Sequence, residues 1–214
     1  FSGSSADNWG YTATYGPDGS MYGGGIVFNS GFPVSTGAFQ TNFRGGNFDI
    51  GIIKLSANGS NRVYATYIGG SGDEQPHSLI VDNQGNLVLA GRTNSPRTGA
   101  GAYPVTGGAA GIVGNGGGYD IVVTKLNANG TALIGSKRIG GISDDGVNIS
   151  DRRNGTNSLQ QNYGDDGRSE VILDGSGNVY VASSTQSTGS ANPADNFPVS
   201  GSPFQSLPGG AQDA

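Results

Sequence analysis

The chain has 214 residues, of which 41 are glycine and only 13% are charged, and its formal net charge is −5. Its lysines and arginines form no run that could neutralise phosphates, which argues against nucleic-acid binding. No stretch approaches the roughly 18 consecutive apolar residues that indicate a membrane-spanning helix. Cysteine is absent, which excludes disulfides, thiolate metal sites and a cysteine nucleophile.

Four kinds of segment recur along the chain in a fixed order. FDIGIIKLSANG (48–59) and YDIVVTKLNANG (119–130) lie 71 residues apart, and YIGGSGDE (67–74) returns at the same offset as RIGGISDD (138–145). FPVSTGAFQ, YPVTGGAAG and FPVSGSPFQ form a third family, and GPDGSMYGGG, VDNQGNLVLAG and LDGSGNVYVAS form a fourth. Tandem recurrence at such periods predicts a repeat architecture.

Each unit contains four short apolar runs separated by Gly, Asn and Asp. In the second unit these runs span 77–82, 86–92, 120–126 and 131–139. They are rich in Val, Ile and Leu, which predicts strands, and no window shows helical spacing. SLIV, LVLA and DIVV do not alternate, which is typical of sheets covered on both faces. We therefore expect an all-β fold of β-propeller blades, each with four antiparallel strands.

The expected organisation is one propeller domain over 1–214. Blade one covers about 9–68, blade two about 77–139 and blade three, incomplete, about 168–214, with an inserted crossover loop at 142–169. FSGSSADN at the start matches YIGGSGDE, and GGAQDA at the end matches the residues that precede a third strand. Both ends fall inside a unit, so we expect the segment to belong to a larger propeller.

The turns predict where binding takes place. DNQGN and DGSGN join first and second strands, SANG and NANG join third and fourth strands, and in such turns glycine supplies a positive φ. If the strands alternate in direction, these short turns share one face. The long connections, about 29–47, 94–118 and 186–212, then share the other face with the insertion. Long loops on a rigid scaffold commonly carry binding sites.

The order of these motifs resembles the bacterial SBBP-type β-propeller repeat. The resemblance rests on YIGGSGDE, HSLIVDNQGNLVLAGRT, YPVTGGA and GGGYDIVVTKLNANG, in that order. NYGDDGRSEVILDGSGNVYVASST in the third unit is further similar to long cell-surface proteins of Bacteroidetes-type bacteria. This resemblance implies a secreted or outer-surface protein, associated with the outer membrane, type IX secretion or gliding. It implies no catalytic residues.

Few side chains could carry chemistry. His77 is the only histidine, so a Ser–His–Asp hydrolase would have to use it, with Asp73 or Asp82 as its orienting partner. Packing at the start of a first strand is the simpler interpretation, with Trp9, and Arg168 in the third unit, as its counterparts. One histidine without cysteine does not provide the ligands of a zinc site.

Carboxylates come in pairs before the first strands or in the crossover. The simplest interpretation is that one member caps a turn and its neighbour is solvated. Calcium, which binds carboxylate oxygens together with backbone carbonyls, is the alternative for the crossover. Its candidate ligands are Asp144, Asp145, Asp165 and Asp166.

These observations favour a non-enzymatic secreted or cell-surface scaffold for adhesion or binding, with no catalytic residues and no cofactor. Its expected partner is a protein or polysaccharide at the cell surface, or a component of the secretion system. The candidate contact residues are Asp151, Arg152, Arg153, Asn157 and Tyr163, all in the insertion. Two alternatives stay open: a glycan-active hydrolase or lyase with catalytic residues in other blades, and a purely structural spacer.

Overall fold

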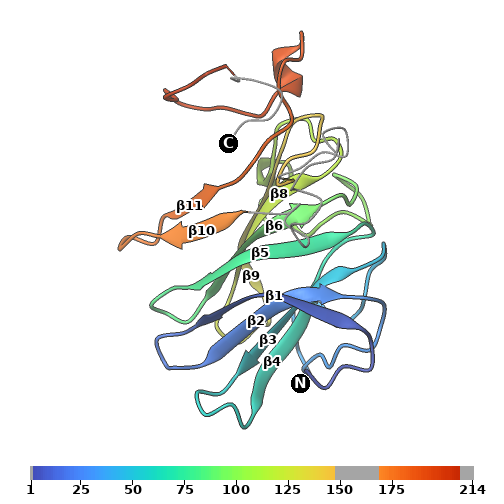
Figure 1. The fold of residues 1–214 in the computed structure, drawn as a ribbon, viewed down its shortest axis with the longest axis vertical. Helices are drawn as coiled ribbons and strands as arrows, with labels where there is room; N and C mark the ends of the chain where they lie inside the picture. The colour runs from blue at the N-terminus through green and yellow to red at the C-terminus, as the bar shows by residue number, and fades with distance from the viewer. Residues whose placement is uncertain (1, 148–168, 208–214) are drawn as a thin grey trace, which may run out of the picture.

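The computed structural model describes residues 2–147 and 169–207, which form three antiparallel sheets in chain order (Figure 1). The first sheet contains β1 (Asn8–Tyr15), β2 (Met21–Val27), β3 (Asp49–Leu55) and β4 (Arg62–Ile68). The second contains β5 (Glu74–Val81), β6 (Leu87–Thr93), β8 (Asp120–Leu126), β9 (Leu133–Ile139) and β7 (Ile112–Val113). The third contains β10 (Glu170–Leu173) and β11 (Val179–Ala182).

The predicted all-β fold with four antiparallel strands in a blade is confirmed by the first two sheets. Their four main strands pair in sequence order, as in a meander. The sequence did not predict β7, which pairs in parallel with the outer edge of β9. The only helical segments in the described ranges are the 3-10 turns η1 (Gly108–Gly111) and η4 (Pro193–Asp195). Neither is long and apolar enough to cross a membrane.

The sheets are held together by apolar layers between their faces. Tyr22, Ile50 and Ile52 of the first sheet share a core with Leu87 and Leu89 of the second. On the opposite face of the second sheet, a smaller cluster includes Val88 and Ala90 from β6 and Val171 from β10. Successive side chains of β6 thus enter different cores, which explains why all seven of its residues are buried and its sequence does not alternate.

The first strands of successive sheets lie against one another, as they do around the axis of a propeller. β1 contacts β5, and β5 contacts β10 (Figure 1). A β-bulge interrupts β1 at Tyr11 and β5 at His77. His77 therefore lies inside its strand, and its counterpart in the first sheet is Tyr11. The predicted equivalence with Trp9 is wrong because the strand begins three residues earlier than expected, at Glu74.

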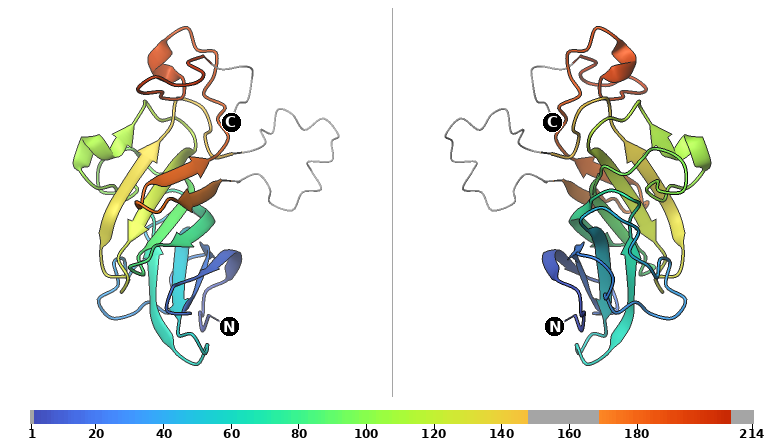
Figure 2. Two further views of the ribbon diagram at one scale, coloured as in Figure 1. Left: turned by 90° about the vertical axis from the view of Figure 1, so that its left-hand side faces the viewer. Right: turned by 90° about the vertical axis from the view of Figure 1, so that its right-hand side faces the viewer.

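Short turns and long connections separate onto opposite ends of the sheets, as the antiparallel pairing requires (Figures 1 and 2). Gly85 in the β5–β6 turn has φ 81°, and a positive φ recurs at the equivalent glycines Gly19, Gly59, Gly130 and Gly177. The opposite end is made by 28–48, 94–119 and 183–207, together with the crossovers 69–73 and 140–147. We call this end the long-loop face.

Candidate functional site

The long-loop face is anchored by a buried carboxylate at the start of β5. Oε2 of Glu74 accepts a hydrogen bond from the backbone N–H of Gly70 at 2.9 Å. Its Oε1 accepts from the hydroxyls of Thr93 at 2.5 Å and Ser95 at 2.6 Å. Because Glu74 is completely buried, these donors replace the water that a carboxylate needs. Glu74 thus fastens the crossover after β4 to the connection after β6.

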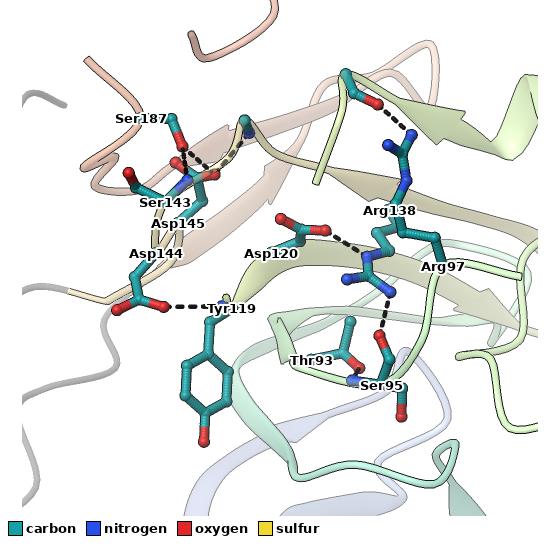
Figure 3. A network of polar contacts seen from close by, with 12 residues as sticks. Thr93, Ser95, Arg97, Tyr119, Asp120, Arg138, Ser143, Asp144, Asp145 and Ser187 are labelled. Atoms are coloured by element: carbon teal, nitrogen blue, oxygen red, sulfur yellow. Dashed lines mark hydrogen bonds and ion pairs between the residues drawn. The ribbon is translucent and has the colours of Figure 1, made fainter. Parts of the chain in front are cut away.

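Asp145 repeats this arrangement between the second and third sheets (Figure 3). Its carboxylate accepts from Gly141 N at 2.8 Å, from Ser187 Oγ at 2.8 Å and from Thr185 Oγ1. Asp145 is also completely buried, and burial raises the pKa of this carboxyl to about 6. The sequence predicted one capping and one solvated carboxylate in each acidic pair; in the two described pairs, Glu74 and Asp145 are buried, and Asp73 and Asp144 are partly exposed.

The first member of each pair binds the preceding sheet. Oδ1 of Asp73 accepts from the backbone N–H of Asn47 at 2.5 Å, and Oδ1 of Asp144 accepts from that of Tyr119 at 2.9 Å. Asn47 and Tyr119 stand just before the third strands, so each acidic pair joins two adjacent sheets. The two described pairs, Asp73–Glu74 and Asp144–Asp145, thus supply the same acceptors at the two described junctions.

These contacts bear on the calcium prediction. In the structure the carboxylates of Asp144 and Asp145 accept hydrogen bonds from the protein itself. Residues 2–147 and 169–207 contain no group of three or more His, Cys, Asp or Glu side chains arranged to hold a metal ion. Asp165 and Asp166 lie outside the described residues, so calcium in the insertion stays a prediction.

A further carboxylate begins the third strand of each complete sheet, and its partner differs between the two sheets. In the second sheet, Asp120 forms a buried ion pair with Arg138 of β9, and Arg138 also donates to the carbonyl of Ser95 (Figure 3). In the first sheet, the position of Arg138 is taken by Tyr67. Among the described residues, no side chain of β4 forms an ion pair with Asp49.

Asp49 instead binds neutral donors and lies close to a second acid. Its Oδ2 accepts from Gln40 Nε2 at 3.2 Å and from the backbone N–H of Arg44 at 2.9 Å. Its Oδ1 and Oε2 of Glu74 both face the position that a Cβ on Gly69 would occupy. Burial, reinforced by the negative charge of Glu74, raises the pKa of Asp49 to about 8.

His77 binds a serine hydroxyl and is apart from the two carboxylates that the sequence offered as its orienting partners. Its Nδ1 is 3.0 Å from the hydroxyl of Ser169, which is itself 2.7 Å from the hydroxyl of Ser183. Burial lowers the pKa of His77 to about 3, so the ring is neutral at ordinary pH. Asp82 binds Lys125 at 2.7 Å and Asp73 binds Asn47. Neither of these two carboxylates, which the sequence offered as orienting partners, contacts His77 in the structure.

Three aromatic side chains meet on the long-loop face at the edge of the first sheet. The ring centres of Trp9 and Phe28 are 5.2 Å apart, and those of Phe28 and Phe48 are 5.7 Å apart, both edge to face. Trp9, the only tryptophan in the chain, is 60% exposed, which is unusual for so large an apolar side chain. We call Trp9, Phe28 and Phe48 the aromatic cluster. The sequence predicted Trp9 only as a packing residue, and the cluster was not predicted.

The same place in the second sheet has different chemistry. Trp9 and Gln75 are each the second residue of a first strand, and Phe48 corresponds to Tyr119 at the 71-residue offset. There, Arg92 donates to Gln75 Oε1 at 2.6 Å and stacks 4.4 Å from the centre of the Tyr119 ring. The second sheet uses these groups to bind one another, whereas the aromatic cluster presents an exposed indole. The cluster therefore breaks the repeat.

The contact residues expected in the insertion, Asp151, Arg152, Arg153, Asn157 and Tyr163, lie outside the described residues, as does Arg168. The structure joins both flanks of the insertion to the third sheet. Asp145 forms a bridge with Thr185, and Ser169 contacts Ser183. The insertion therefore starts and ends beside the core of the second and third sheets.

Antiparallel sheets stacked face to face, with their first strands converging, are the blades of a β-propeller. Residues 63–96 match the family described as the SBBP β-propeller repeat. That stretch runs from β4 through β6 and contains both Glu74 and the hydroxyls that bind it. No curated protein sequence matches the chain.

Proposed function

We propose that this chain is a non-enzymatic binding scaffold that holds a polysaccharide on its long-loop face, with the aromatic cluster as a contact site. The observation that carries the proposal is the exposed Trp9, whose ring packs edge to face against Phe28. The second sheet has a polar network at the same place, in which Arg92 donates to Gln75, and it packs between its neighbours without such an apolar surface. Exposed rings of this kind are enriched where proteins bind partners.

The surroundings of the cluster favour a sugar polymer over a hydrophobic protein segment. Three polar residues are close in sequence to Trp9 or Phe48, namely Ser2, Asn8 and Asn47. The two asparagines are exposed. Their amides and hydroxyl can bond to sugar hydroxyls, while the indole face accepts the C–H face of a pyranose ring. Only 13% of the chain is charged, which suits a neutral or weakly charged polymer.

Trp9 provides its own assay, because it is the only tryptophan and its fluorescence reports on this site alone. Titration with soluble neutral polysaccharides should shift and saturate the emission of the full chain. Trp9→Ala should weaken binding at least about tenfold, the loss typical of a contact worth more than about 1.4 kcal/mol. Its urea midpoint should stay close to that of the parent, since the side chain is mostly exposed.

Tyr15→Ala is the matched control. Tyr15 is 78% exposed on the same strand but at its other end, beside the short turns, so this variant should bind normally. Equal losses in both variants would contradict the assignment of the site. Capture of a protein by the parent but not by Trp9→Ala would replace the polysaccharide with a protein partner. Turnover of a glycan would favour the hydrolase or lyase, and an absence of any binding would favour the spacer.

A location on the bacterial surface is part of the same proposal. It is supported by the resemblance of the third unit to long surface proteins, which implies export and type IX secretion. Protease treatment of intact cells should degrade the protein. In cells that lack the secretion system, the protein should stay inside the cell and be protected from protease. Protection from protease in intact wild-type cells would contradict a surface location without bearing on the aromatic cluster.

A further inference from the structure

The two junctions that connect the three sheets have the same acidic framework with one difference in charge. At the first junction, an ideal Cβ on Gly69 would lie 2.5 Å from Oδ1 of Asp49 and 2.7 Å from Oε2 of Glu74. At the second, a Cβ on Gly140 would lie similarly close to Asp120 and Asp145. Each junction therefore places two buried carboxyls on either side of one glycine. The second junction adds the guanidinium of Arg138.

The first junction lacks this cation. Arg44 contributes its backbone N–H, and its guanidinium is exposed to solvent, where its charge lowers the pKa of Asp49 by less than burial raises it. Tyr67 and Tyr103 are the other titratable groups facing the pair, and burial raises the pKa of both phenols, so they are neutral. Within the described ranges, no lysine or arginine forms an ion pair with Asp49 or Glu74. Two buried negative charges without a cation would be costly.

We propose that Asp49 and Glu74 share one buried proton, which takes the place of Arg138 at the first junction and makes this junction sensitive to pH. Two carboxylates cannot hydrogen-bond to each other unless one carries a hydrogen. Both carboxyls are buried against the same glycine without a cation beside them, so a single hydrogen held between them would let both stay buried. The proposal concerns the joint between blades and is independent of what the aromatic cluster binds.

The other contacts assign the proton to one atom. Both oxygens of Glu74 already accept hydrogen bonds, from Gly70 N on one side and from two hydroxyls on the other. Oδ2 of Asp49 also accepts two. Oδ1 of Asp49 is buried and receives no donor from the rest of the described protein. It is therefore the open position for the hydrogen, from which Asp49 would donate it to Glu74. Oδ1 of Asp120 is likewise buried without a donor, but Arg138 neutralises that carboxylate through Oδ2.

Loss of the proton would affect the long-loop face directly. Asp49 follows Phe48 of the aromatic cluster, and Glu74 follows the crossover 69–73. The folded protein keeps the proton across neutral pH, whereas an unfolded aspartate releases it near pH 4. The folded state thus binds more protons, and its stability falls as pH rises from about 4 toward the raised pKa of about 8. Above that pH, repulsion between the carboxylates should loosen this junction first.

The test replaces the proton by a permanent donor. In Asp49→Asn, the amide NH₂ can take the position of Oδ1 and donate to Glu74, while the amide oxygen keeps the two bonds of Oδ2. In Glu74→Gln, an NH₂ at either oxygen position would face a donor, Gly70 N–H or the two hydroxyls. Urea midpoints of the full chain should be measured from pH 5 to pH 9 for the parent and both variants. Asp120→Asn serves as the control at the second junction.

We expect the parent midpoint to fall over this range and the fall to be much smaller in Asp49→Asn, which should exceed the parent in stability at pH 9. Glu74→Gln should be less stable than Asp49→Asn throughout. Asp120→Asn should lose stability at every pH, because it leaves the buried Arg138 without its carboxylate. A parental slope in Asp49→Asn would overturn the proposal. If that variant does not fold, carbon-13 NMR of the parent decides, because titration of the Asp49 carboxyl below pH 5 would also overturn it.

Discussion

At the hairpin turns, the backbone conformation determines which residue type is tolerated. The turn from Asp82 to Asn86 places Gly85 at φ 81°, and Oδ1 of Asp82 accepts from Gln84 N and Asn86 N. An added Cβ at Gly85 would meet only the side chain of Ala128, at 3.5 Å. There is space for a side chain, so any cost of substitution comes from the left-handed φ.

Gly85→Val should therefore destabilise the protein by about 1–3 kcal/mol, the usual cost of holding a branched residue at positive φ. Gly175→Val is the control, because Gly175 occupies the β10–β11 turn with open space and without a positive φ. It should change the free energy of unfolding by less than about 0.5 kcal/mol, as surface substitutions usually do. Chemical denaturation measures both, and an unchanged Gly85→Val would refute the turn assignment.

At the scale of elements, burial on both faces distinguishes β6 from the strands at the sheet edges. Leu89 of β6 is 1% exposed and belongs to the core between the first two sheets. Ile134 of β9 is 53% exposed. The uninterrupted apolar sequence LVLA predicted the double burial of β6. The two-residue β7 was not predictable, because so short a strand has no periodicity and exists only where β9 offers an edge.

Leu89→Ala should cost about 2–5 kcal/mol, through lost apolar burial and a cavity that the sheets cannot close. Ile134→Ala removes the same number of carbon atoms from an exposed position and should cost less than about 1 kcal/mol. The difference between the two free energies of unfolding tests whether the first two sheets share a single core. Similar costs for the two variants would contradict that packing.

For the whole molecule, the buried titratable groups oppose one another in their pH dependence. His77 has a pKa lowered to about 3, so the unfolded chain binds a proton below about pH 6.5 that the folded chain refuses. Stability is therefore lost as pH falls from 6.5 toward 3. Asp49 and Asp145 have raised pKa values and remove stability as pH rises above about 4. Folding stability should peak between these limits.

The measurement is the urea midpoint of the full chain from pH 3 to pH 9, with a maximum expected in mildly acidic solution. Each proton contributes a slope of at most about 1.4 kcal/mol per pH unit. His77→Asn, which can keep a hydrogen bond to Ser169, should flatten the acid side and leave the alkaline side unchanged. A midpoint that rises continuously up to pH 9 would show that the raised carboxyl pKa values do not govern stability.

The sequence by itself determined the repeat, the main strands, the hairpin glycines and the separation of short turns from long connections. These features follow from backbone preferences and from apolar runs a few residues long. Each of them occurs in more than one repeat, which strengthens the prediction. The sequence also located the acidic pairs but misjudged their burial. Only the tertiary structure decided which carboxyls face each other. Asp49 and Glu74 are distant in the chain. Their proposed shared proton depends on the tyrosine at position 67, where the second sheet has Arg138. The aromatic cluster likewise joins residues from β1 and from both ends of the connection between β2 and β3. Burial and charge are properties of such assembled neighbours, and no local pattern records them.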